Sequence, residues 1–231
     1  MNIVQYIPLP IRIILSHFRE LNGIKSIFGK YSICGLYTYV SYSVKARNWE
    51  HVDLRRGAQV HRGTHFHTNY TSKIKYIVIG ERTYIGQNCY FSAGELIEIK
   101  SDCLIGASCN FLGAGHQYSS PTISYAFAPV ISYGKIILGT NTWVGVGSTI
   151  LGNVEVGFGS IIAAGTMLRF SVPPLCFVAG NPAKVVKAFN WITKEWINLP
   201  ESQHKKKVAL EKHAALLPTE KDFTEQLKFR P

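Results

Sequence analysis

One histidine stands where a repeating pattern of the sequence breaks. His116 follows Gly115 and precedes residues 117–137, which do not continue the repeat. Imidazole titrates near neutral pH, so a histidine in this position can act as a general base. Most isolated histidines are structural, and the position alone leaves both interpretations open.

Three further histidines, His61, His65 and His67, lie close together in the sequence. In an extended strand His65 and His67 would share a face, and that spacing could hold a metal ion. No carboxylate or cysteine lies at ligand spacing, and a basic, aromatic surface explains the cluster as well. We therefore predict no metal site.

The cysteines also carry no recognisable chemical motif. They are odd in number, show no CxxC spacing, and occur in a chain without a secretory start, so reduced thiols and a cytoplasmic location are expected. The five are Cys34, Cys89, Cys103, Cys109 and Cys176.

The element that positions His116 is predicted from a period of six. Fourteen of the 20 glycines fall between residues 79 and 168. Aliphatic residues recur six apart at Leu138, Val144, Ile150, Val156, Ile162 and Leu168, and small residues follow one and four positions later. A period of six fits neither a helix nor an ordinary half-buried strand.

The pattern predicts an all-β solenoid whose chain turns a corner every six residues. Each short strand points one aliphatic residue inward, a small residue fills the corner, and glycine takes the positive-φ position. A two-residue slip between Phe91 and Ile99 is read as a bulge. With that slip, Ile85 and Ile105 share a face on adjacent coils, and Cys89 stacks on Cys109.

Three segments follow from this pattern. Residues 1–33 are predicted to form a helical N-terminal cap, residues 34–189 the solenoid with an extruded loop at 117–137, and residues 190–231 a helical tail. No transmembrane helix is expected, because glycine and proline interrupt the apolar stretches.

The net charge is +11, and the first 75 residues hold eleven of the 25 Lys and Arg residues but three of the 14 Asp and Glu residues. No nucleic-acid-binding motif accompanies this charge, so a nucleic-acid partner is not expected. The N-terminal segment could lie weakly on an anionic membrane surface, although covering the open end of the solenoid is the commoner role.

The hexads, the histidine after the broken coil, Trp143 at the return of the repeat, and Pro173-Pro174 followed by AGNPAK from Ala179 resemble the hexapeptide-repeat acyltransferases. The branch that is most similar contains galactoside, maltose, nodulation-factor and surface-polysaccharide O-acetyltransferases. The resemblance implies a left-handed parallel β-helix, a homotrimer with active sites between subunits, and acetyl-CoA as co-substrate without a metal.

The resemblance also implies roles for individual residues. His116 corresponds to the general base and Trp143 to a residue needed for activity. The implied cofactor-binding residues are Val146, Ala164, Gly165, Arg169, Lys184 and Lys187, the last two for the phosphates of CoA. Relatives often carry an asparagine where Gly86 stands, which leaves Asn88 and Ser92 as the nearest polar acceptor contacts. Tyr118, Tyr125 and Phe127 are candidates to stack on the acceptor sugar, although packing inside the loop is the commoner role of such residues.

The predicted function is acetyl transfer from acetyl-CoA to a sugar hydroxyl of a bacterial surface polysaccharide or its precursor, directly within a ternary complex. Three alternatives stay open. They are N-acetylation of a nucleotide-linked amino sugar, a γ-carbonic-anhydrase-like trimer, and a non-catalytic trimeric scaffold.

Overall fold

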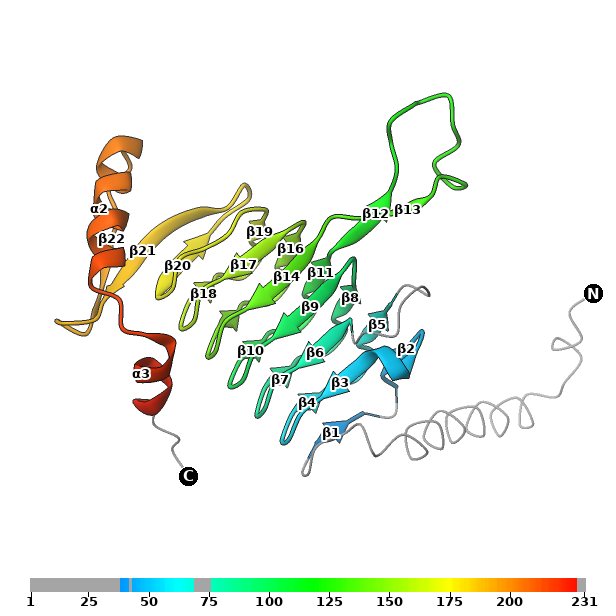
Figure 1. The fold of residues 1–231 in the computed structure, drawn as a ribbon, viewed down its shortest axis with the longest axis horizontal. Coiled ribbons are helices and arrows are strands. Elements are labelled where there is room, and N and C mark those ends of the chain that lie inside the picture. The colour runs from blue at the N-terminus through cyan, green and yellow to red at the C-terminus, as the bar shows by residue number, and fades with distance from the viewer. Residues whose placement is uncertain (1–37, 42, 69–75, 228–231) are drawn as a thin grey trace, which may run out of the picture.

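The computed structural model describes residues 38–41, 43–68 and 76–227 (Figure 1). The predicted N-terminal cap at 1–33 and its membrane-binding alternative lie outside these residues. In the described part of the chain, no helix is both long and apolar enough to cross a membrane.

Most of the described chain forms three stacks of short parallel strands, which it visits in turn on each coil. The nine-stranded sheet holds β1 (Tyr39–Val40), β4 (Gln59–Val60), β7 (Tyr84–Ile85), β10 (Leu104–Ile105), β15 (Trp143–Val144), β18 (Ile161–Ile162), β20 (Cys176–Ala179), β21 (Lys184–Asn190) and β22 (Glu195–Asn198). The six-stranded sheet holds β2 (Lys45–Ala46), β5 (His65–His67), β8 (Tyr90–Ser92), β11 (Asn110–Leu112), β16 (Thr149–Leu151) and β19 (Met167–Leu168). The five-stranded sheet holds β3 (Val52–Leu54), which follows the short helix η2 (Trp49–His51), then β6 (Ile77–Ile79), β9 (Leu96–Ile99), β14 (Lys135–Leu138) and β17 (Val154–Val156). This three-sided coil confirms the predicted parallel β architecture.

The aliphatic columns of the sequence become ladders inside the coil. Ile85 pairs with Ile105, and Val144 pairs with Ile105 and with Ile162, so one inward residue stacks on the next. All four of these side chains are fully buried. On the six-stranded sheet the inward column is aromatic, and the rings of Phe91 and Phe111 stack with their centroids 4.6 Å apart. Burial of these columns supplies the main free energy of folding.

The glycines that follow the aliphatic columns serve a purpose different from the one the sequence predicted. Gly106 and Gly145 do not have positive φ. A Cβ on Gly106 would lie 2.6 Å from the backbone nitrogen of Val146 on the next coil, so these positions need glycine because two backbones approach closely. The positive-φ positions lie two residues later, at Gly147 with φ 69° and at the equivalent Ser108 with φ 58°.

The predicted two-residue slip between Phe91 and Ile99 is present: Ile79 pairs with Ile99, 20 residues later, whereas Leu138 pairs with Val156, 18 residues later. Cys89 and Cys109 precede paired residues of β8 and β11, as expected for stacked positions. Their thiols donate to the carbonyls of Gly106 and Gly145, each at 3.2 Å. Cys103 and Cys176 are likewise buried and unpaired, and burial raises the pKa of each thiol to about 12. The thiols of Cys103 and Cys176 are therefore protonated, and all four described cysteines are buried in the core.

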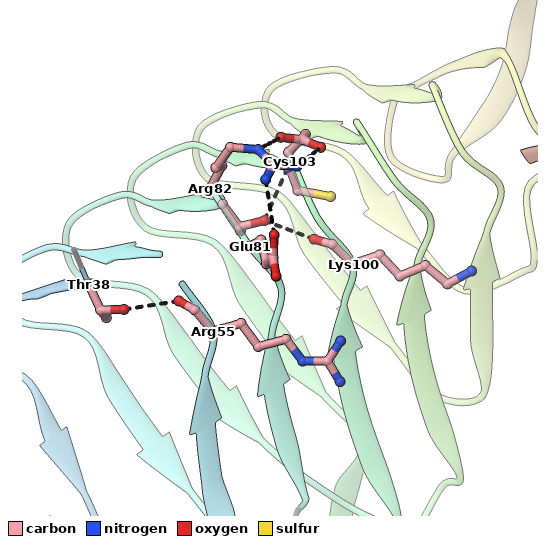
Figure 2. Close-up of polar contacts among 8 residues, drawn as sticks. Thr38, Arg55, Glu81, Arg82, Lys100 and Cys103 are labelled. Atoms are coloured by element: carbon pink, nitrogen blue, oxygen red, sulfur yellow. Dashed lines mark hydrogen bonds and ion pairs between the residues drawn. The ribbon is translucent and has the colours of Figure 1, made fainter. Parts of the chain in front are cut away.

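Side-chain hydrogen bonds connect neighbouring coils at the corner between the five-stranded and nine-stranded sheets (Figure 2). Arg82 takes a left-handed conformation there with φ 54°, and its guanidinium donates to both carboxylate oxygens of Asp102 at 2.7 and 3.0 Å. The hydrogen bond to Asp102 raises the pKa of Arg82. Thr38 fastens the first described coil by donating to the carbonyl of Arg55 at 3.0 Å.

The tail after residue 190 begins as a hairpin, which corrects the expectation that the segment around Trp196 is helical. Strand β21 turns back on β20, and β22 then pairs with β21, placing Trp196 opposite Phe189. The ring of Trp196 packs edge-on against Phe177 and Phe189, and these contacts hold it in the sheet. Helices α2 (Gln203–Ala215) and α3 (Glu220–Glu225) follow at this end of the solenoid (Figure 1).

Helix α3 is fastened to the solenoid through Glu220. Its carboxylate accepts hydrogen bonds from Lys100 Nζ at 2.8 Å and from Thr140 Oγ1 at 2.9 Å. Partial burial by itself raises the pKa of Glu220, but the hydrogen bonds from Lys100 and Thr140 outweigh burial and lower that pKa. The resulting stability is present above the unfolded-state pKa of about 4.3 and is lost as pH falls through the folded-state value.

We expect Glu220→Gln to lower the Tm at pH 7 by about 2 °C, and the difference from the wild type to shrink as pH falls from 5 to 3. Calorimetric scans across this pH range measure both effects. Glu225→Gln is the matched control, because the exposed Glu225 makes only a 3.9 Å ion pair with Lys221. A Tm difference for Glu220→Gln that is the same at pH 7 and pH 3 would contradict this account.

Candidate active site

His116 lies at the root of a hairpin that leaves the solenoid. Strand β12 (Ala114–His116) pairs antiparallel with β13 (Val130–Ser132), and the loop between them projects away from the coils (Figure 1). The Nδ1 atom of His116 lies 2.8 Å from the carbonyl oxygen of Ala128. A carbonyl oxygen only accepts, so Nδ1 carries a proton, and in the neutral ring Nε2 holds the lone pair. The exposed imidazole is thereby oriented as a base.

The hairpin depends on a close contact at Gly115. A Cβ at this position would collide with the hydroxyl end of Tyr133, which packs directly on the glycine backbone. The amide of Tyr133 also donates to the carbonyl of Gly113 at 2.7 Å. These contacts fix the strand that carries His116 to the strand that returns to the coil.

The loop aromatics do not pack inside the loop, contrary to the commoner role expected for them. Phe127 is 89% exposed and Tyr118 is 72% exposed, and Tyr125 is also exposed. Such rings are free to contact a ligand or another chain. The acceptor-binding role of all three stays a prediction.

Trp143 lies on a different side of the solenoid from His116. It belongs to β15 of the nine-stranded sheet, whereas the His116 hairpin leaves between the six-stranded and five-stranded sheets. The indole is 48% exposed and faces a groove that the C-terminal tail borders. One chain therefore does not bring His116 and Trp143 together.

Three of the cofactor-binding candidates, Val146, Ala164 and Gly165, lie at the corner between the nine-stranded and six-stranded sheets. We call these three residues the Val146 column. The amide of Gly165 donates to the carbonyl of Val146 at 2.9 Å, and the amide of Gly147 donates in the same way to Ala107 one coil earlier. Val146, Ala164 and Gly165 are all exposed. Small side chains and accessible backbone make this corner a smooth edge along which a slender ligand can lie.

Part of the chain is similar in sequence to known transferases, although no family model matches it. A Staphylococcus aureus (strain MRSA252) protein provisionally named an acetyltransferase is 34% identical over 134 residues, which cover 58% of this chain and 64% of that protein. A provisionally named lipopolysaccharide biosynthesis O-acetyl transferase of Escherichia coli (strain K12) is 25% identical over 126 residues, or 52% of this chain and 64% of that protein. The chain thus spans less than two thirds of the length of these relatives.

Among solved structures, an N-acyltransferase from Bacillus cereus, in complex with dTDP and 3-hydroxybutyryl-CoA, superposes with a TM-score of 0.58. It is 20% identical, and the match covers 83% of this chain and 94% of that chain, so the likeness concerns the fold. This chain resembles the hexapeptide-repeat acyltransferases in sequence and in fold. The resemblance gives roles to several residues, and in this fold those residues lie on separate surfaces.

The three cationic residues that the resemblance implies for cofactor binding have different surroundings. Lys184 lines a groove of about 620 Å3 between β21 and α2, together with Lys206 and Lys207. Lys187 instead lies over the ring of Phe177, with Nζ 5.8 Å from the ring centroid. Arg169 follows β19 and lies at the corner between the six-stranded and five-stranded sheets. The His116 hairpin leaves the solenoid at this same corner two coils earlier, and the Val146 column lies at a different corner.

The polar acceptor candidates lie on earlier coils. Asn88 occupies a left-handed corner position with φ 57°, and its side chain packs over Gly63 of the preceding coil. Ser92 is paired with Leu112 and His67 on the six-stranded sheet, one coil before the strand that leads to His116. Gly86 has a backbone so close to Gly106 and Ala107 that it admits no side chain, which explains why an asparagine cannot stand there.

The histidine cluster is divided by the fold. His61 lies between the rings of Tyr39 and Tyr84, whereas His65 and His67 lie on β5 with ring centroids 6.2 Å apart. Arg47 donates to Nε2 of His67 at 2.8 Å. Burial, then the charges of Arg47 and His65, lower the pKa of His67, so the ring is neutral at pH 7. No metal-binding group of His, Cys, Asp or Glu is found among the described residues.

The contact between His116 and the carbonyl of Ala128 could not be predicted from the sequence. Every residue has a backbone carbonyl, so the residue type at position 128 does not indicate this contact. The sequence also did not predict that the aromatic residues of the tail line a groove. Their number near Trp191 and Trp196 was visible, but the hairpin that turns them toward Trp143 was not.

Proposed function

We propose that this chain is an acetyl-CoA-dependent O-acetyltransferase that modifies a sugar hydroxyl of a bacterial surface polysaccharide or its precursor. The observation that carries the proposal is the orientation of His116 by the Ala128 carbonyl, which leaves Nε2 as the base at the mouth of an exposed loop. The name of the Escherichia coli relative supports a hydroxyl acceptor on a glycan.

In the proposed step, Nε2 of His116 takes the proton of the acceptor hydroxyl while the oxygen attacks the thioester carbonyl carbon. A backbone N–H stabilises the negative charge that develops on the carbonyl oxygen. The carbon–sulfur bond then breaks, the acetyl group stays on the sugar oxygen, and the departing thiolate recovers the proton from His116. No acyl-enzyme is required.

The residues of the Val146 column fit the slender pantetheine arm of CoA, because their exposed backbone and small side chains leave room beside the coil. Acyl-CoA in the Bacillus cereus structure of the same fold supports this cosubstrate. Lys184, Lys187 and, more weakly, Arg169 would meet the phosphates.

The proposed active unit is a homotrimer of left-handed coils. In one chain, His116 and the Val146 column stand at different corners, so a second copy is needed to bring base and cosubstrate together. The exposed aromatic loop offers apolar surface for that contact.

A second candidate is N-acylation of a nucleotide-linked amino sugar. The Bacillus cereus structure, an N-acyltransferase solved with dTDP, favours it. The same base and cosubstrate would serve, and an amine would replace the hydroxyl as nucleophile.

The decisive experiment is CoA release from acetyl-CoA by the purified chain, with free sugars, nucleotide-linked amino sugars, oligosaccharides and polysaccharide fragments as acceptors. Release that requires a hydroxyl acceptor supports the proposal, and release that requires an amino sugar favours the second candidate. No release with any acceptor, together with no binding of acetyl-CoA, would favour a non-catalytic scaffold.

Replacing Lys184 and Lys187 together by alanine is expected to raise the KM for acetyl-CoA about tenfold and to leave kcat nearly unchanged, because the lost phosphate contacts bind ground state and transition state equally. Initial rates at varied acetyl-CoA measure the split. Lys206→Ala with Lys207→Ala is the control for lysines elsewhere in the α2 groove. An unchanged KM in the Lys184/Lys187 variant would remove these residues from the cosubstrate site.

A further inference from the structure

The tail of the chain builds a groove beside Trp143. The groove measures about 460 Å3 and lies between β15 and β18 of the solenoid, the β21–β22 hairpin, and α3. Its volume falls within the range of small-molecule sites. Trp143 borders it, and Val146 of the proposed cosubstrate corner follows three residues later in the chain.

The walls of the groove are aromatic and held in place. Trp196 is fixed by edge-on contacts with Phe177 and Phe189, with centroid separations of 6.1 and 5.3 Å, and yet it remains 36% exposed. Trp191 packs against Phe223 of α3. When a flat ring binds to an aromatic surface that is already rigid and partly exposed, little side-chain conformational entropy is lost.

The polar lining identifies the class of ligand. Asn141 and Gln226 contribute amide groups that can donate and accept hydrogen bonds. Among the described lining residues the charged side chain is Lys194, whose ammonium lies 3.2 Å from the centroid of Trp191 and is engaged there. Aromatic faces with neutral amides suit a neutral ring that has an apolar face and hydroxyl edges, which is a pyranose.

We infer that this groove binds neutral pyranose residues of the acceptor chain beyond the residue that is acetylated. The inference rests on the proposed function for its catalytic consequence, since it makes the acceptor an oligosaccharide or polysaccharide in preference to a single sugar. Trp196 and Gln226 are then specificity-determining residues supplied by the tail.

Binding tests the groove without any turnover. Tryptophan fluorescence is titrated with maltohexaose and cellohexaose, and with adenosine as a non-saccharide ring. We expect quenching by at least one saccharide in the wild type, about tenfold weaker binding in Trp196→Ala, and recovery in Trp196→Phe. Quenching by adenosine alone, or by none of the probes, overturns the inference whatever the fate of the transferase proposal.

Kinetics test the consequence for specificity. With the acceptor found by CoA release, we expect the oligosaccharide to have a lower KM than its single sugar. Trp196→Ala and Gln226→Ala should raise the oligosaccharide KM about tenfold while the KM values for the single sugar and for acetyl-CoA stay unchanged. Ile192→Ala is the matched control, because Ile192 is exposed in the turn of the same hairpin and outside the groove. Equal KM values for oligosaccharide and single sugar, or an unaltered preference in Trp196→Ala, overturn the inference.

Discussion

His116→Ala is expected to lower kcat for acetyl transfer by at least about 10³-fold while the fold and the assembly persist. The imidazole is the group at the mouth of the loop that is oriented with a free Nε2, and alanine cannot take the proton of the acceptor hydroxyl. His116 is exposed on a hairpin outside the coils, so its loss removes no core contact. Steady-state CoA release with saturating acetyl-CoA measures the effect.

The matched control is His204→Ala, which removes an exposed histidine from helix α2. Its kcat should equal that of the wild type. Circular dichroism and sedimentation velocity should be indistinguishable for all three proteins. A His116→Ala protein that keeps more than about a tenth of the wild-type kcat would refute the role of His116 as the general base.

The largest effect on stability is expected from Gly145→Ala. The added methyl would collide with the backbone nitrogen of Ala164 on the next coil, and a backbone that is hydrogen-bonded on both sides cannot move away cheaply. Overpacking of this kind costs about 3 kcal/mol. Urea unfolding followed by circular dichroism measures the loss in the free energy of unfolding.

Gly147→Ala, two residues later in the same corner, is the comparison variant. It separates the cost of a close approach between coils from the cost of a left-handed backbone conformation. Gly147 has φ 69° and no atom within 4 Å of a Cβ, so alanine there meets only the left-handed penalty of about 1 kcal/mol. Equal destabilisation by Gly147→Ala and Gly145→Ala would contradict the account in which the close approach of two coils makes Gly145→Ala the costlier change.

The candidate site could be predicted only in part. The break of the hexads after Gly115 indicates His116, because a repeat that stops at a histidine is visible in the residues themselves. The fixed tautomer could not be predicted, since it depends on the Ala128 carbonyl across a hairpin. The sequence also places Lys184 and Lys187 close together, whereas the structure gives them different partners, α2 residues and Phe177.

The sequence by itself determined the coil, because a solenoid is built from local repeats. Each aliphatic residue six positions after the last enters the coil interior from the next of the three sheets, so Leu138, Val144 and Ile150 predict their own burial without knowledge of distant contacts. Only the tertiary structure decided why Gly145 is glycine, and that Trp196 stands in a strand beside the Trp143 groove. Both depend on contacts between segments far apart in the chain, and the spacing of residues along the sequence carries no measure of how closely two backbones pass.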